Sequence, residues 1–456
     1  MIDTLRCMRT LSILLRSGLL LNLASLPACA NATAMPGLAE FGITYWWGPP
    51  PSETNPARYD EIKSAGFNLV SLPSPDVRDE FHPYFDKALN TRILDLCAAR
   101  GMKALVADQR MAEALGADGH AVDEILDGIV ADYKDHPALY GYYVVDEPTT
   151  ERYPRLARIV ARLREKDPAH VAYVNLFPIY APAEFLKAKD YQEYVERFVT
   201  EVKPAFISYD NYHFVLPNVL VKRPESFASD QEQAVWETAH AAAQGDDRPG
   251  FFDNLEIVRA VAMKHDLPFM VIVLLTTHGL YRDLTEPELR WEAFQTLAYG
   301  SSCLSWFTYW APPDDDAWHF RNAVFNWDGQ MTDHYGEVTR VNADVRVLGN
   351  KLMGKGSEAV YCVGSERNQL VRRFVPHGPV RAIEGPRLTA GFFEGGYLLL
   401  AHKNYREAGE VTLYLTDGAK AWLIDKPTGT ERPLTVHDGK VTLTLAPGDG
   451  DLLRLE

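Results

Sequence analysis

Short apolar runs alternate with amphipathic segments between residues 39 and 355. In the amphipathic segments apolar residues recur every three or four positions, which is typical of helices that bury one face. The apolar runs show little polar alternation, which is typical of parallel strands covered on both sides. Strands are predicted at 41–48, 68–75, 102–108, 139–148, 170–178, 205–214, 268–279 and 303–310. Helices are predicted between them, for example at 84–101, 121–136, 153–167, 252–266 and 337–354.

This alternation of eight strands with helices predicts a (β/α)8 or TIM barrel over residues 33–355. An open doubly wound sheet shows the same alternation, but it carries a glycine-rich phosphate-binding loop after its first strand. The chain has WWGPPPSETNP at 46–56 instead. The sequence therefore favours the α/β barrel.

The hydrophobic period changes after residue 356. Segments such as GGYLLLAHKN at 395–404 and GEVTLYLTDG at 409–418 read as short strands, divided by Gly, Asp and Pro turns. Residues 356–456 are therefore expected to form a small C-terminal antiparallel β-sandwich.

The N-terminal segment 1–32 is typical of an export signal. It combines three arginines with the short apolar run GLLLNLASL at 18–26 and with small residues at 28–34 that suit cleavage. A secreted or periplasmic protein is expected, with lipid anchoring through Cys29 as the alternative. No later run is apolar enough over a sufficient length for a transmembrane segment.

The charge and the cysteines exclude several classes of function. The formal net charge of −16 argues against nucleic acid as a partner. Cys97, Cys303 and Cys362 are widely spaced and odd in number, so we expect buried apolar side chains and no disulfide framework. The chain has no CxxC or HxxxH spacing, and neither a metal site nor an organic cofactor is expected.

Aromatic residues, carboxylates and amides gather where the predicted strands end, with little lysine or arginine. Enzymes with this barrel build their sites at the carboxyl ends of the strands. Aromatic rings stack on sugar faces and carboxylates supply proton transfer, whereas a phosphate site would want basic groups. A carbohydrate substrate is therefore expected. The candidate residues are Tyr45, Trp46, Trp47, Asp108, Asp146, Glu147, Asn175, Asp210, Asn211, Tyr212, His213, His278, Trp306, Tyr309 and Trp310.

The stretch VVDEP at 144–148 resembles the Asn-Glu-Pro motif at the end of strand four in retaining (β/α)8 glycoside hydrolases. The resemblance implies that Glu147 is the general acid/base. Asp146 then stands where that superfamily has an Asn that binds the sugar 2-hydroxyl. Segments 288–310 and 326–349 are also similar to β-galactosidase-like bacterial members, so the resemblance covers most of the barrel region.

One departure from this pattern concerns the nucleophile. The superfamily carries a nucleophilic Glu at the end of strand seven, where this chain has Thr276, Thr277 and His278. The nearby Glu288 follows Thr285 by three residues, which is the spacing of a helix capping box, and a structural role is expected for it.

The second carboxylate is therefore expected elsewhere. Asp210 is the first choice because it ends strand six, and Asp108 is the second. A displaced second acid suits an inverting mechanism, in which about 6.5–9.5 Å separates the carboxyl groups; retention needs about 5–5.5 Å. The sequence gives a weak preference for inversion.

The other candidates have two interpretations each. The tryptophans serve as sugar platforms or as barrel packing, and about half are expected to face the site. Asn175 and Asn211 suit sugar hydroxyls, although Asn is also common in turns. His213 and His278 contact hydroxyls or are structural.

The sequence thus predicts a secreted glycoside hydrolase that uses Glu147 and Asp210. Two alternatives stay open. One is a non-catalytic glycan-binding protein on a degenerate barrel, and the other is a transglycosylase or lyase that uses the same residues. The sequence carries no signature of an oligomeric state.

Overall fold

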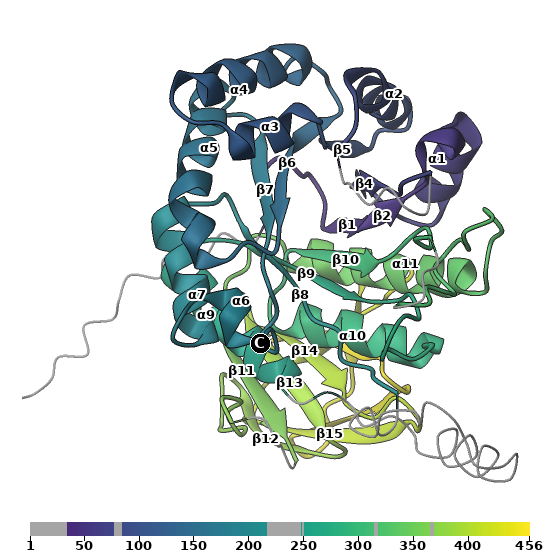
Figure 1. Ribbon diagram of the computed structural model, residues 1–456. Helices are drawn as coiled ribbons and strands as arrows, with labels where there is room; N and C mark the ends of the chain where they lie inside the picture. Colours follow the sequence, from purple (N-terminus) through teal and green to yellow (C-terminus); the bar gives the residue numbers. More distant parts are fainter. Residues whose placement is uncertain (1–33, 77–83, 217–247, 249, 314–317, 365–368) are drawn as a thin grey trace, which may run out of the picture.

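The computed structural model describes residues 34–76, 84–216, 248, 250–313, 318–364 and 369–456 (Figure 1). The predicted export signal at 1–32 lies outside the described residues. No helix in these ranges has both the length and the apolar character that crossing a bilayer requires.

Parallel strands form two four-stranded sheets in the first three quarters of the described chain. Their orders are β1-β10-β9-β8 and β3-β5-β6-β7, and a short β2-β4 pair extends the first two strand positions. The strands are β1 (Gly42–Tyr45), β2 (Trp47–Gly48), β3 (Leu69–Val70), β4 (Leu72–Pro73), β5 (Lys103–Val106), β6 (Leu139–Asp146), β7 (Val171–Asn175), β8 (Ile207–Asp210), β9 (Phe269–Leu274) and β10 (Cys303–Phe307).

Backbone hydrogen bonds join the outer edges of these two sheets. Leu176 N, just after β7, donates to Ser208 O in β8 at 2.9 Å. Asn68 N, just before β3, donates to Ile43 O in β1 at 3.1 Å. The parallel strands and their order confirm the predicted α/β class, with each predicted strand segment containing an observed strand.

Helices alternate with the strands and cover the sheets (Figure 1). In α5, apolar residues at three- and four-residue spacing are buried, which explains why this segment folds as a surface helix. Side chains of Asn55 and Asp86 cap α1 and α2 by accepting from backbone amides. The helices are α1 (Pro56–Ser64), α2 (Lys87–Ala98), α3 (Arg110–Gly116), α4 (His120–Tyr133), α5 (Tyr153–Lys166), α6 (Ala183–Leu186), α7 (Tyr191–Arg197), α9 (Phe251–Lys264), α10 (Glu286–Ala298) and α11 (His334–Leu352).

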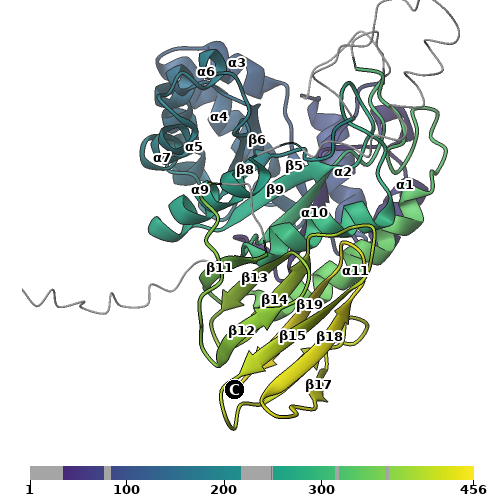
Figure 2. The same ribbon diagram turned by 90° about the horizontal axis from the view of Figure 1, so that it is seen from below.

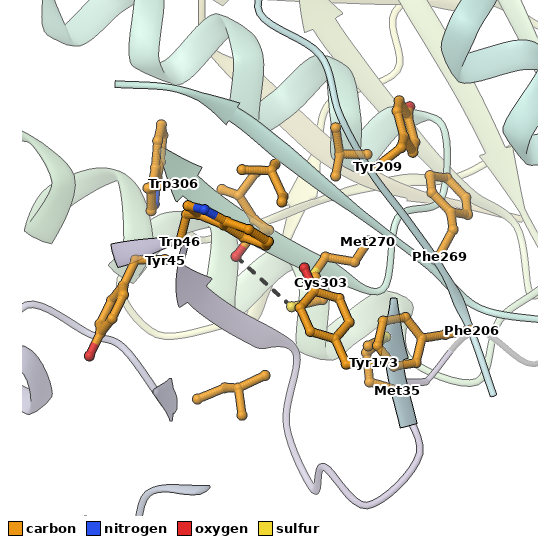
Figure 3. Close-up of a cluster of buried hydrophobic side chains, with 14 of the residues drawn as sticks. Met35, Tyr45, Trp46, Tyr173, Phe206, Tyr209, Phe269, Met270, Cys303 and Trp306 are labelled. Atoms are coloured by element: carbon orange, nitrogen blue, oxygen red, sulfur yellow. Dashed lines mark hydrogen bonds between the residues drawn. The ribbon is translucent and has the colours of Figure 1, made fainter. Parts of the chain in front are cut away.

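Large aromatic side chains fill the space between the parallel strands. The ring of Trp46 meets Tyr143 and Tyr173 edge-on, with centroids 6.1 and 6.2 Å away. Figure 3 shows Trp46 and Tyr173 in one cluster with Met270 and Cys303. Cys97, Cys303 and Cys362 are all buried, which confirms the expectation for the cysteines.

Two antiparallel sheets follow α11. Their orders are β11-β13-β14-β19-β16-β17 and β12-β15-β18, and their facing apolar side chains form one hydrophobic cluster. Figure 2 shows the six-stranded sheet beside α10 and the three-stranded sheet beyond it. The strands are β11 (Ser357–Val363), β12 (Val380–Glu384), β13 (Leu388–Phe393), β14 (Tyr397–His402), β15 (Gly409–Leu415), β16 (Ala421–Ile424), β17 (Glu431–Leu434), β18 (Lys440–Leu445) and β19 (Gly450–Leu455).

The six-stranded sheet lies against α10 in direct contact. Trp291 Nε1 donates to Lys403 O at 3.2 Å, and Gln295 Nε2 donates to His402 O at 3.1 Å. A Cβ atom at Gly391 in β13 would overlap the carbonyl oxygen of Ala298. The sheet can approach the helix this closely because position 391 has no side chain.

We therefore predict that Gly391→Ala lowers the free energy of unfolding by about 1–3 kcal/mol, the usual cost of overpacking. Chemical denaturation measures this loss. Gly116→Ala is the matched control, because nothing lies within 4 Å of a Cβ at that helical position. An equal effect of both variants would show that the contact with α10 is not tight.

Candidate active site

The end of β6 has an unusual backbone conformation. The strand ends at Asp146, and Glu147 follows with φ of 42°, which is rare for a residue with a side chain. Glu147 N donates to Asn175 O at 2.9 Å and so fixes this turn. The β6–β7 register also shifts between Tyr143 and Val145, and such bulges redirect the side chains that follow. Strain of this kind is common at functional sites.

Asn175, at the end of β7, holds two carboxylates of the site. Its Nδ2 donates to Asp146 Oδ1 at 3.0 Å and to Asp210 Oδ1 at 3.2 Å. Ser208 Oγ donates to Asn175 Oδ1 at 2.9 Å and fixes the orientation of the amide. The amide of Asn175 therefore positions the carboxylates, a role that the sequence alone did not indicate.

Glu147 and Asp210 share a hydrogen bond. Burial raises the pKa of Glu147 well above its ordinary value, and the nearby charges of Asp210 and Asp146 raise it further. Burial and the charge of Asp146 also raise the pKa of Asp210, but the hydrogen bond from Glu147 lowers it. Glu147 therefore holds the proton of this hydrogen bond more strongly than Asp210 does.

The three carboxyl groups differ in their access to solvent. Asp210 is buried, with 7% of its surface exposed, Glu147 is half-buried, and Asp146 is exposed. The protein around Asp146 still raises the pKa of its carboxyl, against the hydrogen bond from Asn175, which lowers it. A ligand can therefore reach the acid pair from the side of Asp146.

An aromatic wall continues from the acid pair across the ends of β8, β9 and β10. The Tyr212 ring lies 5.8 Å from His278, 5.2 Å from Tyr281 and 5.1 Å from Phe307, measured between centroids. The His278 ring lies 6.0 Å from that of Trp318. Trp318 is 48% exposed, so part of its surface faces solvent.

Further residues that the sequence did not indicate lie beside Tyr212. Tyr180 OH accepts from Tyr212 N at 3.2 Å and from Tyr281 OH at 3.5 Å. The guanidinium of Arg248 lies 3.7 Å from the centroid of the Tyr180 ring. Tyr180, Arg248, Tyr281 and Trp318 lie in loops, where no hydrophobic period indicates their positions.

The aromatic residues predicted at the ends of strands one and eight are almost fully buried. Tyr45, Trp306, Tyr309 and Trp310 are each at most 1% exposed. Trp306 Nε1 donates to Asn342 Oδ1 in α11 at 2.9 Å, so this side chain faces the helix layer. Trp310 stacks on a neighbouring phenylalanine, and Tyr45 packs 5.0 Å from Tyr309.

Trp46 and Trp47 are also buried, each at 5% exposure. Trp46 belongs to the aromatic packing between the strands, as described above. The Trp47 ring lies 5.9 Å from Phe307, which belongs to the aromatic wall. Of the predicted tryptophans, Trp47 therefore lies against the wall.

Asp108 is not brought to the acid pair. Arg110 Nε donates to Asp108 Oδ1 at 2.9 Å, and Tyr133 OH donates to its Oδ2 at 2.6 Å. Burial acts to raise the pKa of Asp108, but these hydrogen bonds lower it overall. Asp108 therefore joins α3 to α4, and Asp210 provides the second carboxylate beside Glu147.

The remaining candidates are buried polar residues. His213 stacks on Trp291, with centroids 4.4 Å apart, and Asn211 Nδ2 donates to Phe251 O at 3.4 Å. His278 Nδ1 donates to Thr276 O at 2.7 Å, and burial lowers the pKa of His278 to about 4. His278 is therefore neutral at neutral pH and serves as part of the aromatic wall.

The end of strand seven carries no carboxylate toward the pair. Thr276 Oγ1 lies 3.0 Å from Thr308 Oγ1, and Thr277 Oγ1 donates to Asp283 Oδ1 at 3.0 Å. Glu288 forms the predicted capping box with Thr285, which confirms its structural role. Among the described residues, no group of three or more His, Cys, Asp or Glu side chains is placed to hold a metal ion.

Comparison with solved structures identifies the fold. A glycoside hydrolase family 5 protein from Bacteroides vulgatus ATCC 8482 superposes with a TM-score of 0.55 at 12% identity, over 91% of this chain and 89% of that chain. A catalytic mutant of a family 42 β-galactosidase from G. stearothermophilus gives a TM-score of 0.52 at 10% identity, over 93% and 99% of the two chains.

The chain shares its fold with (β/α)8 glycoside hydrolases. A third structure, described as a glycoside hydrolase, agrees with a TM-score of 0.53 at 11% identity, over 90% of this chain and 92% of that chain. No protein-family model and no curated protein sequence matches the chain. The likeness covers both the parallel and the antiparallel sheets, and at this identity it concerns the fold alone.

The raised pKa values make the acid pair unfavourable for stability. Above the ordinary pKa of a carboxyl group, the unfolded chain releases protons that the folded site retains, so the free energy of unfolding falls as pH rises. Asp210→Asn removes one of these groups and keeps an oxygen for Asn175. We expect the variant to be more stable than the wild type at about pH 8, by on the order of 1–3 kcal/mol.

Urea denaturation across this pH range measures the difference, which should shrink toward about pH 4, where ordinary carboxyl groups also hold protons. Asp417→Asn is the control, because Asp417 is 96% exposed on the antiparallel sheets. A variant that is less stable than the wild type at every pH would contradict the proposed strain in the acid pair.

Proposed function

We propose that the protein is a glycoside hydrolase in which Glu147 is the general acid/base and Asp210 is the nucleophile. The observation that carries this proposal is the hydrogen bond between the two carboxyl groups at the ends of β6 and β8. One group holds the proton that a leaving sugar oxygen needs. The other gives up its proton more readily, as a group that must be ionised to act as nucleophile should.

The reaction then proceeds in two steps. Glu147 donates its proton to the glycosidic oxygen while Asp210 attacks the anomeric carbon, and the bond from that carbon to the leaving group breaks. A covalent glycosyl ester on Asp210 results. Glu147, now ionised, takes a proton from water, which attacks the anomeric carbon and releases Asp210. The product keeps the anomeric configuration of the substrate.

The spacing of the acids supports retention over the inversion that the sequence weakly favours. An inverting enzyme separates its carboxyl groups by about 6.5–9.5 Å so that a water molecule fits between them. Glu147 and Asp210 are close enough to share a hydrogen bond, which is nearer to the separation of about 5–5.5 Å in a retaining pair than to the inverting separation. Retention therefore agrees better with the geometry of Glu147 and Asp210.

Asp146 is proposed to bind a sugar hydroxyl beside the reacting carbon. It is exposed, and it lies next to Glu147 in the position where the resembled superfamily has an Asn. Asn175 bonds to its Oδ1, and each carboxylate oxygen has more than one lone pair, so the exposed carboxyl group can also accept a hydroxyl proton. The proposal also includes secretion through the segment 1–32, a closed (β/α)8 barrel and a C-terminal β-sandwich.

A non-catalytic glycan-binding protein is the second candidate function. Thr276 and Thr277 at the end of strand seven favour it, because the superfamily's nucleophile is missing there. The direct contact of Glu147 with Asp210 favours catalysis, because an acid pair with raised pKa values is costly to a protein that only binds.

The proposal predicts that Glu147→Gln lowers the rate of sugar release on the order of 10²–10⁴-fold, since the amide cannot donate the acid proton. Reducing-end assays on a panel of plant, algal and bacterial glycans measure this rate. Asp108→Asn is the matched control and should keep its turnover, provided that the variant is folded. An active Glu147→Gln enzyme would contradict the acid role.

The same assay distinguishes the two mechanisms. Proton NMR of the first product formed shows the anomer before mutarotation, and retention predicts the anomer of the substrate. Inverted product would remove Asp210 from the nucleophile role. Binding without any turnover, seen as quenching of tryptophan fluorescence, would favour the glycan-binding protein.

Trp318 is proposed as a sugar-stacking platform at the far end of the aromatic wall. Trp318→Ala should raise KM about 3- to 10-fold with a smaller change in kcat, because stacking contributes to binding more than to bond cleavage. Phe185→Ala is the control, since Phe185 is 50% exposed but lies on α6. A fall in kcat alone would contradict a platform role.

A further inference from the structure

Arg248 is a cation on the rings of Tyr180 and Tyr281 that no described carboxylate neutralises. Its backbone N donates to His213 O at 2.8 Å, which anchors it beside the end of β8. Its guanidinium lies over the Tyr180 ring at 3.7 Å and 5.2 Å from the Tyr281 ring. Within the described ranges, no Asp or Glu oxygen pairs with this half-buried side chain.

Arg58 provides an instructive contrast. Its guanidinium also lies over aromatic rings, 5.1 Å from Trp310 and 5.0 Å from Phe325. However, Glu53 and Glu61 pair with Arg58 at 3.0 and 3.1 Å. Arg58 thus combines stacking on rings with ion pairs to two carboxylates. Arg248 has only the stacking among the contacts that the described residues make.

A guanidinium that lies flat on a ring keeps the N–H groups along its edge for ligands. These donors match the two oxygens of a carboxylate or a sulfate in a forked pair of hydrogen bonds. Tyr180 is itself fixed by Tyr212 and Tyr281, so the platform under Arg248 is preorganised. Donors left without acceptors in a half-buried position are costly, and an anionic ligand would satisfy them.

The location of Arg248 relates it to the reacting sugar. Both Tyr180 and Tyr281 lie within electrostatic reach of Arg248 and of Asp210. Without a nearby cation, the charges of Asp146 and Asp210 would repel an anionic substrate. Arg248 supplies that cation at the Tyr180 side of the acid pair, where a substituent of the bound sugar can lie.

We propose that Arg248, held on Tyr180, binds the anionic group of an acidic sugar, and that the substrate is therefore a glycan that carries carboxylate or sulfate groups. This inference rests on the proposed function, since it deepens the choice of substrate at the same site. It also narrows the expected carbohydrate substrate to an acidic glycan.

The test compares polymers that differ only in the anionic group. Polygalacturonate and alginate are each paired with their carboxyl-reduced forms, and carrageenan and fucoidan with their desulfated forms. Binding is measured by tryptophan fluorescence at constant ionic strength in the Glu147→Gln background, and turnover is measured with wild-type Glu147. We expect at least one anionic polymer to bind about 10- to 100-fold more tightly than its neutral partner.

Arg248→Met should abolish that preference and leave the neutral partner bound equally well, whereas Arg248→Lys should keep part of it because it keeps the charge. Arg381→Met is the matched control, since Arg381 is 58% exposed on the antiparallel sheets. The uronate and sulfate pairs identify which anion is bound. Circular dichroism shows that each variant is folded.

The outcomes separate this inference from the proposed hydrolase. A preference for the anionic polymer that depends on Arg248, without turnover of any substrate, would keep the inference and reject the hydrolase. Turnover without a preference for the anionic member of any pair would reject the inference and keep the hydrolase. A preference that persists in Arg248→Met would also overturn it.

Discussion

The amide of Asn175 determines the arrangement of the site. One NH2 group donates to both Asp146 and Asp210, and it holds these carboxylates in place although their charges repel each other. The backbone carbonyl oxygen of Asn175 accepts a hydrogen bond from Glu147 N. This bond fixes the left-handed turn at Glu147, which is the third acid of the site. The ends of β6, β7 and β8 are thereby tied together by one side chain and its backbone. The hydrogen bond from Asn175 also lowers the pKa of Asp210, which helps Glu147 to hold the proton of the pair.

Such an arrangement has a cost in stability, which the proposed catalytic role would explain. Burial raises the pKa values of Glu147 and Asp210, so the folded state binds protons that the unfolded chain would release at neutral pH. Replacing these groups by apolar residues would relieve this strain. The positive φ at Glu147 adds to this cost, because the surrounding hydrogen bonds must hold the backbone in a strained conformation. The parallel strands and the aromatic packing around them offset the stability that is lost at the acid site.

The sequence predicted the elements and part of the site. Apolar periodicity located the parallel strands, and the rule that sites lie at strand ends led to Glu147 and Asp210, which the structure brings together. The same rule indicated aromatic residues that are buried, since it does not say on which side of the sheet a side chain lies. Trp306 is an example, because it lies at a strand end but its side chain faces α11. Asp108 pairs with Tyr133, which is distant in sequence, and Arg248 and Trp318 belong to loops without any period.

Trp291 of α10 contacts both the parallel and the antiparallel region. One edge of its indole donates to Lys403 O in the antiparallel region, and one face stacks on His213, which follows the strand that ends at Asp210. Phe393, Leu399 and Leu452 of the antiparallel region also belong to the larger hydrophobic cluster of the parallel region. The antiparallel region therefore shares part of its hydrophobic core with the parallel region. In proteins with flexibly tethered domains, one module can be exchanged for another without changing its neighbour. Exchange of this region would also require a new surface on α10.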